Sequence, residues 1–360
     1  MEACNGQPSA SYRIGIDILR AVTVSHFDLA PLQTELGAAI FRELPASHPS
    51  PEITRFYTLL RDYPERGGKR LRGLVLLLSA AAHGAPWQQG LGVAAALELF
   101  QNWVLVHDDI EDDSEDRRGR PALHKQVGVP VALNVGDALH IYMWRTLLRH
   151  TWVMGAPGQR IVETFEETIS RTAEGQHLDL AWVAEERFDV TEADYLAMVT
   201  LKSAYYTVVG PLVLGALCAG AAPDPRLTEA GRALGVAFQI RDDVLNLMRD
   251  VSYGKEFAGD LFEGKRTLVL AHFFAHAAPE LQNEVKTLLG KPRVQKTHAE
   301  VEHVLLLLRA AGSLAYAQGV AEEKAETGLT LLQACLGELP GQDAAEAILT
   351  TLAEVAQRRT

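Results

Sequence analysis

LVHDDIEDDSEDRRGRPALH, from Leu105 to His124, places a dense group of charges at the end of the apolar segment LGVAAALELFQNWVLV. A helix rises ~1.5 Å per residue and turns every ~3.6 residues, so Asp108 and Asp112 share one face with Cβ atoms ~5–6 Å apart. Like charges at this spacing destabilise a helix, and a cation held between them removes the penalty. Oxygen ligands on one face suit Mg²⁺, which usually keeps water and shares substrate phosphates. The stretch therefore predicts a helix that ends at a metal site.

A second acidic group lies much later in the chain, in FQIRDDVLNLMRD. Asp242 and Asn246 are again four positions apart, and Gln239 lies about one turn before them. An acidic pair on a helix face rich in apolar residues is rarer than a solvated pair. The helix itself is predicted from apolar residues at helical spacing, which are Leu227, Leu234, Phe238, Leu245 and Met248.

Each acidic group also has a simpler interpretation. Acidic runs are usually solvated helix faces or helix caps, and for either group alone this interpretation is favoured. A calcium loop is a second alternative, because Asp112, Ser114 and Asp116 have the alternating spacing, but Arg117 stands where such a loop requires Gly. Zinc-protease, Walker and dinucleotide-binding motifs are absent from the sequence.

Basic residues are clustered although the chain is acidic overall. The clusters are Lys69, Arg70 and Arg72 in GGKRLRG, Arg117, Arg118 and Arg120 after the first acidic group, the single Lys202, and Lys255, Lys265 and Arg266 in GKEFAGDLFEGKRT. Each cation alone is ordinarily a solvated charge. Carboxylates that hold metal, together with cations that fork onto oxygens, are what a diphosphate group needs. The combination therefore predicts a diphosphate site.

Bulk composition narrows the class of protein. The chain has 360 residues, 48% of them hydrophobic, which is ample for a buried core. Its net charge of −12 is the opposite of what nucleic-acid-binding proteins carry, so that class is excluded. Cys4, Cys218 and Cys335 lack metal-site spacing and indicate a reducing compartment. No secretory leader is visible, and apolar stretches such as Pro211–Pro223 are too short to span a bilayer. These features predict a cytoplasmic protein without a transmembrane segment.

The pattern along the chain predicts an all-α fold. Apolar residues recur mostly at helical spacing, and strand-like alternation is scarce. Loops rich in Pro and Gly separate the helical segments, and Asp224-Pro225 is a predicted helix start. No repeat or composition shift marks a boundary, so we expect a single domain over residues 1–360 with a core of about residues 15–340.

The motifs resemble those of the trans-prenyl diphosphate synthases, or polyprenyl synthetases, over nearly the whole chain from GGKRLRG to FEGKRTL. The first motif is DDIED followed by RRGRP, and the second is DDVLN preceded by FQ, in the family's order. Asn246 stands where many members have a last Asp, and it should weaken a metal contact there. The resemblance implies a single large helical bundle of the isoprenoid synthase type, with a central cavity between antiparallel helices. It also implies a homodimer.

The resemblance implies roles for individual residues. Asp108 and Asp112 would hold two Mg²⁺ ions and Asp242 a third, with Asp243 and Asp260 assisting through water. Substrate-binding residues are implied as well: Arg117, Lys202, Lys255 and Lys265 for the allylic diphosphate, Lys69, Arg72 and Arg118 for isopentenyl diphosphate, and Gln239 and Ser203 at the reaction centre. Gln101 stands where the family commonly has a His that binds isopentenyl diphosphate, so this contact keeps a donor without a charge.

The implied reaction joins isopentenyl diphosphate to a dimethylallyl, geranyl or farnesyl diphosphate. The allylic C–O bond ionises, and Mg²⁺ and fixed cations stabilise the charge that builds on the leaving diphosphate. The double bond of isopentenyl diphosphate attacks the allylic cation, and a proton is lost to the departing diphosphate. No protein base is required, which agrees with the lack of an obvious one in the sequence.

Product length is expected to depend on residues just before the first acidic motif. The family pattern points to Trp103 and Phe100 as the floor of a tunnel for the growing tail, whereas the alternative is that both are ordinary core aromatics. A bulky floor predicts a short product, geranylgeranyl diphosphate first and farnesyl diphosphate second. The small Val104 argues against farnesyl diphosphate, because this position is often aromatic in those enzymes.

Two functions of other classes fit part of the pattern. A class I terpene cyclase shares the fold and a DDxxD motif, but it would need an NSE-type second motif and no isopentenyl diphosphate site. A catalytically weak partner subunit is permitted by Gln101 and Asn246, although the retained acidic pairs and basic clusters argue against it.

Overall fold

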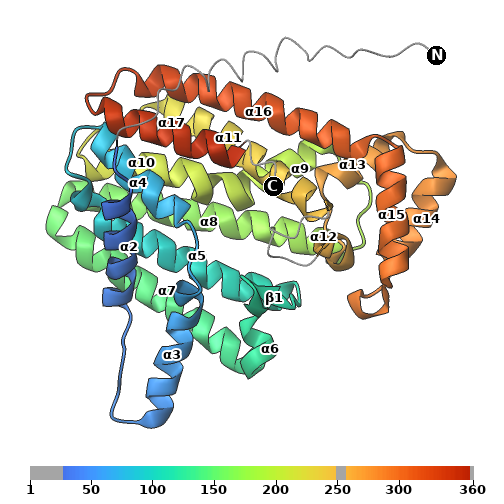
Figure 1. The fold of residues 1–360 in the computed structure, drawn as a ribbon, viewed down its shortest axis with the longest axis horizontal. Helices are drawn as coiled ribbons and strands as arrows, with labels where there is room; N and C mark the ends of the chain where they lie inside the picture. Colours follow the sequence, from blue (N-terminus) through green and yellow to red (C-terminus); the bar gives the residue numbers. More distant parts are fainter. Residues whose placement is uncertain (1–26, 249–256, 357–360) are drawn as a thin grey trace.

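The computed structural model describes residues 27–248 and 257–356, and over them the chain is almost entirely helical (Figure 1). This confirms the predicted all-α class. Strands occur within that part of the chain at β1 (Asp116–Arg117) and β2 (Arg120–Pro121), which pair as a small antiparallel hairpin. The hairpin consists of the RRGRP segment that follows the first acidic motif.

The first half of the chain forms the helices from α2 to α8. They are α2 (Ala30–Glu43), α3 (Pro51–Glu65), α4 (Leu71–Ala82), the short η1 (Trp87–Gly90), α5 (Leu91–Glu111), α6 (Leu123–Val127), α7 (Val129–Thr151), the short η2 (Trp152–Met154) and α8 (Ala156–Ala184). The first acidic motif lies at the C-terminal end of α5, as the sequence predicted.

The second half of the chain begins with an α-helix, α9, that continues as a π-helix, η3. They are α9 (Glu192–Val199), the π-helix η3 (Thr200–Val209), α10 (Gly210–Cys218), α11 (Pro225–Asn246), α12 (Gly259–Glu263), α13 (Leu268–His276), α14 (Pro279–Leu289), the short η4 (Arg293–Gln295), α15 (His298–Ala310), α16 (Ser313–Leu336) and α17 (Gln342–Ala356). The predicted start of α11 is confirmed, because the Asp224 side chain accepts a hydrogen bond from the Arg226 backbone N–H.

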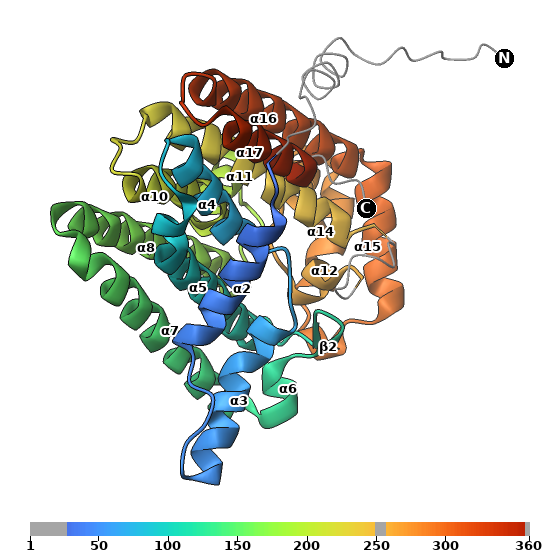
Figure 2. The ribbon, with the colours of Figure 1, turned by 60° about the vertical axis from the view of Figure 1, so that its left-hand side comes forward.

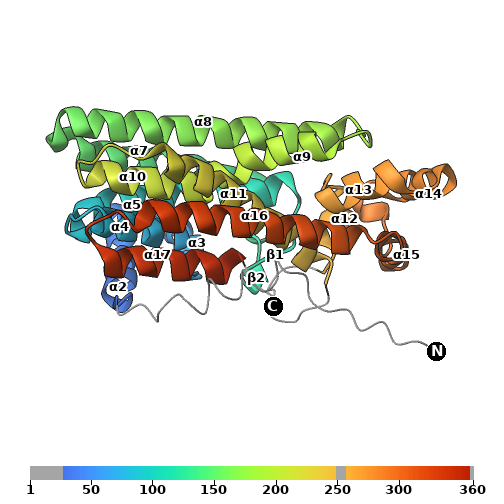
Figure 3. The ribbon, with the colours of Figure 1, turned by 90° about the horizontal axis from the view of Figure 1, so that it is seen from above.

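The long helices lie side by side along the molecule's long axis, with α8 at one edge of the bundle and α17 at the opposite edge (Figure 3). In the packing between them, α5 contacts α7, α11 contacts α16, and η3 is held between α8 and α11. Helices α2 and α3 run across this direction at one side of the bundle (Figure 2). The acidic ends of α5 and α11 thus belong to neighbouring layers of one bundle.

Two clusters of buried apolar side chains hold the bundle together. The larger one joins α4, α5, α7, α10 and α17, and the smaller one joins α9, α13, α15 and the C-terminal half of α11. Glycine allows the closest approach between helices: a Cβ on Gly175 of α8 would lie 2.1 Å from the backbone nitrogen of Lys202. This contact places Lys202 directly against α8.

The predicted end of the core at about residue 340 is wrong. Helix α17 lies beyond it, packs against α4 and α16, and buries Ile348 and Leu352 almost completely. The apolar residues of this segment recur at helical spacing, which favours a packed helix over a frayed end. The predicted start of the core at about residue 15 lies outside the described residues.

One helix is longer and more apolar than the sequence suggested. Helices α9, η3 and α10 run on as a single helix from Glu192 to Cys218, and Pro211 of α10 does not end it. By length and composition this helix could cross a membrane. However, 78% of its most apolar window is buried inside the bundle, as expected for a core helix.

Candidate active site

A central cavity of about 500 Å³ opens between α5, α8, η3 and α11. Residues of both acidic motifs and at least one residue of each basic cluster reach it. Among its lining residues are Phe100, Gln101, Trp103, Val104, Asp108, Arg117, Lys202, Ser203, Gln239, Asp242, Asp243, Asp260 and Lys265. The predicted central cavity is therefore present, and it gathers residues that are far apart in the sequence.

The carboxylates meet at one end of this cavity. Asp108 of α5 and Asp242 of α11 line it together with Asp260 of α12. Asp112 lines a small adjoining recess that it shares with Asp108 and Asp260. The two acidic motifs thus face one space, which is the arrangement that a shared diphosphate site requires.

Asp112 forms a buried ion pair across this recess. Its Oδ2 lies 2.6 Å from the Nζ of Lys265, and the same Nζ lies 2.8 Å from Glu263. Burial, together with the nearby charges of Asp108 and Glu263, raises the pKa of Asp112 to about 7, although the charge of Lys265 opposes this rise. The recess therefore concentrates negative charge that is only partly neutralised by the protein.

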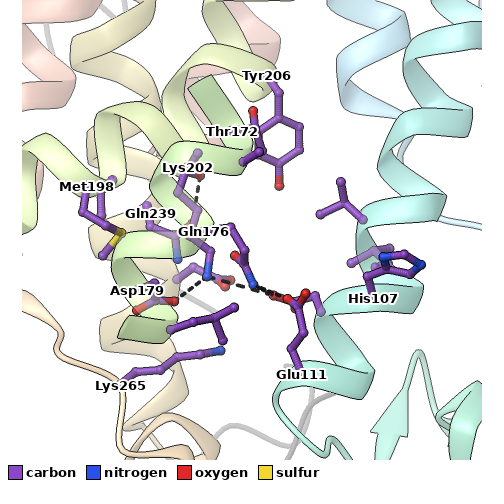
Figure 4. Close-up of a pocket in the computed structure, with 18 of the residues that line it drawn as sticks. His107, Glu111, Thr172, Gln176, Asp179, Met198, Lys202, Tyr206, Gln239 and Lys265 are labelled. Atoms are coloured by element: carbon purple, nitrogen blue, oxygen red, sulfur yellow. Dashed lines mark hydrogen bonds and ion pairs between the residues drawn. The ribbon is translucent and has the colours of Figure 1, made fainter. Parts of the chain in front are cut away.

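Lys202 and Gln176 bring polar groups to the same end from the opposite wall (Figure 4). The Nζ of Lys202 donates to Asp179 Oδ2 at 2.5 Å and lies 4.0 Å from Asp108 Oδ1. Gln176 donates to Glu111 Oε2 at 2.6 Å and to Asp108 Oδ1 at 3.5 Å. These contacts link α8 and η3 to the acidic end of α5.

Arg117 is held by a carboxylate that points away from the recess. Asp109 is fully buried. Its Oδ1 accepts hydrogen bonds from Nε of Arg117 at 2.9 Å and from Nη2, and its Oδ2 accepts a third from Nε at 3.1 Å. The hydroxyl of Tyr63 donates to Oδ2 of Asp109 at 2.5 Å and accepts from the Leu123 backbone N–H at 3.0 Å. The second Asp of the first motif therefore positions a cation.

A hydrogen-bonded chain runs from η3 to α11. Ser203 Oγ donates to Gln239 Oε1 at 2.9 Å, and Gln239 Nε2 donates to Asp243 Oδ1 at 2.8 Å. Asp243 also accepts from the Tyr195 hydroxyl at 2.7 Å. Burial raises the pKa of Asp243 to about 6 in spite of these two donors. Both oxygens of Asp243 are thus engaged by side chains of the protein.

The residues expected to bind isopentenyl diphosphate are only partly gathered. Arg72 and Gln101 line the cavity, and the Arg72 guanidinium lies 4.2 Å from the Tyr206 ring centre. Lys69 is exposed, and Arg118 donates to the Tyr63 carbonyl at 3.0 Å, so neither reaches the cavity wall. Lys255 lies outside the described residues.

Asn246 serves a purpose that the sequence did not indicate. Its side-chain oxygen accepts the Asp260 backbone N–H at 3.1 Å, and its own carbonyl accepts the Ala258 N–H at 2.8 Å. The side chain is almost completely buried. Asn246 therefore fixes the start of α12, the helix that carries Asp260.

Four residues of this site were not predicted from the sequence: Gln176, Asp179, Asp109 and Tyr63. A signal existed for the first two, because GQHLD places an amide and a carboxylate three positions apart inside an apolar helical segment. No such signal existed for Tyr63, which lies 46 residues from Asp109. Its partner is set by the packing of α3 on α5.

Comparison with known proteins gives the family. The polyprenyl synthetase family model matches residues 53–308. A geranylgeranyl diphosphate synthase of Methanosarcina mazei is 34% identical over 84% of this chain and 90% of its own, and an octaprenyl diphosphate synthase of Escherichia coli is 32% identical over 81% and 86%. The chain belongs to the polyprenyl synthetase family. It is a trans-prenyltransferase with the isoprenoid synthase fold.

A solved polyprenyl synthetase with a similar fold is the geranylgeranyl pyrophosphate synthase from Corynebacterium glutamicum, complexed with isoprenyl diphosphate and magnesium. It superposes with a TM-score of 0.83 at 26% identity, and the match covers 92% of this chain and 100% of that one. The relatives carry names for products of different length, so membership in the polyprenyl synthetase family leaves the product of this chain open.

Proposed function

We propose that this prenyltransferase elongates an allylic diphosphate with isopentenyl diphosphate to geranylgeranyl diphosphate. The observation that carries the proposal is a single cavity with carboxylates and cations at one end and Phe100 and Trp103 in its wall. The polar end suits two diphosphate groups, and the bulky rings suit a tail of limited length. Val104 is small, which favours the twenty-carbon product over farnesyl diphosphate.

We further propose that about three Mg²⁺ ions bind at the polar end. Enzymes of this family use Mg²⁺. Within residues 27–248 and 257–356, no three acidic, His or Cys side chains converge tightly enough to hold a metal ion by themselves. This donor set fits Mg²⁺, which is typically held by one or two carboxylates with water and substrate phosphates as the remaining ligands. Asp108 and Asp112 would hold two ions and Asp242 the third. When bound, Mg²⁺ neutralises charge on the leaving diphosphate.

The protein's own residues supply the other half of the electrostatics. Lys202 and Arg117 place cations beside Asp108, and Lys265 places one beside Asp112. All three would bind the allylic diphosphate as charge develops on it. Each preorganised donor of this kind is worth ~3–4 kcal/mol of transition-state stabilisation. At the isopentenyl diphosphate end, Arg72 and Gln101 would orient the second substrate.

We place Ser203 and Gln239 at the reaction centre. They are hydrogen-bonded directly to each other, and both side chains are neutral. Gln239 is oriented by its hydrogen bonds to Ser203 and Asp243, which fix the direction of its amide. A neutral amide dipole can stabilise an allylic cation without reacting with it. The proton lost in the last step would go to the departing diphosphate, so no side-chain base is assigned.

The test is a comparison of Asp108→Ala and Asp242→Ala with the wild type. We expect turnover of labelled isopentenyl diphosphate to fall about 10²–10³-fold in each variant, with an unchanged helical circular dichroism spectrum. Glu322→Ala, on the exposed side of α16, is the control and should keep full activity. Near-normal turnover in both Asp variants would refute the metal assignment, and chain-length analysis of the wild-type product would test the geranylgeranyl assignment.

We also propose that the protein is a cytoplasmic homodimer. An exposed apolar stripe on α7 supports the dimer: Val129, Leu133, Ile141 and Leu148 are 44–64% exposed and recur at helical spacing. Such a stripe suits a self-complementary interface between two copies.

A further inference from the structure

Five aromatic rings form a closed circuit at the tail end of the cavity. Trp103 contacts Phe100 at 5.5 Å between ring centres, and Phe100 contacts Phe165 at 6.5 Å. Phe165 contacts Trp144 at 6.2 Å, Trp144 contacts His140 at 6.4 Å, and His140 stacks on Trp103 at 4.2 Å. The rings come from three helices, α5, α7 and α8.

The circuit has two layers. Phe100 and Trp103 line the cavity, whereas His140, Trp144 and Phe165 lie behind them and do not line it. Phe165 is buried to 1% exposure, so it closes the space behind Phe100. A growing tail that displaces a front ring would therefore meet a second wall.

His140 is the member that fixes the front layer. Its ring lies nearly parallel to Trp103, at 21° between planes, and its Nε2 accepts the Trp144 indole N–H at 2.8 Å. This hydrogen bond orients the imidazole, and the stacked imidazole in turn restricts rotation of Trp103. The indole N–H of Trp103 has no hydrogen-bond partner in the described part of the chain, so stacking carries its orientation.

We propose that His140, held by Trp144, is a specificity-determining positioning residue that sets product length by locking Trp103 as the tunnel floor. The inference rests on the proposed function and deepens it. Product length would then depend on residues of α7 and α8 as well as on those of α5. Phe165, packed behind Phe100, would block a tail that passes the tunnel floor.

The protonation of His140 gives this lock a pH dependence. Burial lowers the pKa of His140; Asp137 of α7 raises it, and His107 of α5 lowers it. The neutral ring, which accepts from Trp144, is therefore the form present at pH 7 and above. Because the pKa of His140 lies below the ordinary histidine value of about 6.5, a proton reaches Nε2 only under more acidic conditions, where it displaces the Trp144 N–H and releases the lock.

The experiment measures turnover and product length together in the wild type, His140→Ala, His140→Phe and Trp144→Phe. For His140→Ala we expect the ratio of longer products to the main product to rise about tenfold, the size of effect that small pocket changes carry. His140→Phe keeps the stacking and should restore most of the short product, with no change between pH 5.5 and 8. The wild type should shift toward longer products at the lower pH.

Matched controls are His303→Ala and Trp152→Phe, two residues of the same types on the exposed surface. Both should leave product length unchanged. An active wild type whose length distribution is the same in His140→Ala and Trp144→Phe would overturn the inference and leave the proposed function intact. A folded wild type that incorporates no isopentenyl diphosphate would refute the proposed function itself. Trp144→Phe keeps an aromatic ring at this half-buried position and removes only the N–H donor and part of the ring system, so it tests the lock even where His140→Ala is unstable.

Discussion

At the scale of single residues, Asn246 corrects an interpretation that the motif alone invites. Because it replaces an acidic residue of the family motif, Asn246 suggests a weakened metal ligand. However, its side-chain oxygen accepts a hydrogen bond from the Asp260 backbone N–H. An oxygen at this position is what the contact needs, and either an amide or a carboxylate supplies it. The difference from the family pattern therefore does not mark a decayed site.

Asn246→Ala should remove the side-chain oxygen that accepts the Asp260 N–H and cost ~1–3 kcal/mol of unfolding free energy. Turnover should fall with it, because Asp260 is held by this bond. Asn246→Asp keeps the oxygen and should retain most of both properties. Urea denaturation and steady-state kinetics on the two variants check this. Wild-type stability in Asn246→Ala, or a large gain of activity in Asn246→Asp, would indicate instead that this position acts as a metal ligand.

The candidate carboxylates could be predicted from sequence because their partners are local. Asp108 and Asp112 share a helix face by spacing alone, and the same holds for Asp242. Partners from distant segments could not be predicted: Lys202 meets Asp179 across 23 residues, and Lys265 meets Asp112 across 153. Only the packing of α5, α8, η3 and the segment that follows α12 around one cavity creates those pairs.

At the scale of elements, the β1–β2 hairpin shows how a charged loop is held in place. The side chain of Arg66, at the C-terminal end of α3, is completely buried. It donates to the carbonyls of Arg117 at 2.9 Å and Pro121 at 3.0 Å, and to Asp62 at 2.7 Å. The basic run after the first acidic motif was predicted, but a strand pair two residues long has no periodicity that could reveal it.

Arg66→Met should release this hairpin. Breaking a buried ion pair typically costs ~3–5 kcal/mol, and the freed loop should raise the KM for the allylic substrate because Arg117 lies on it. Amide hydrogen exchange over residues 116–121 should accelerate in the variant. Arg120→Met is the matched control: this half-exposed cation pairs with the same Asp62 and should cost less than ~1 kcal/mol. Unchanged exchange in Arg66→Met would show that the hairpin is held by other contacts.

At the scale of the whole molecule, local periodicity predicted the helical class but misplaced the end of the core. Helix α17 returns to pack against α4, which lies far away in the sequence, and buries Ile348. Contacts between helices that are far apart in the sequence decide which apolar helix faces are buried within one chain. The sequence therefore could not show that α7 keeps an apolar stripe exposed.

Ile141→Asp tests whether that stripe joins two copies. Ile141 is 64% exposed in the middle of α7, so a charge there should not disturb the folded chain, but it would be buried without a partner in a dimer. We expect the variant to elute as a monomer in size-exclusion chromatography with light scattering, while the wild type elutes as a dimer. Val294→Asp is the matched control, because Val294 is 86% exposed on η4, away from α7. A dimeric Ile141→Asp protein would place the interface on another face. Loss of product-length control in the monomer would show that the partner supports α7 and its aromatic rings.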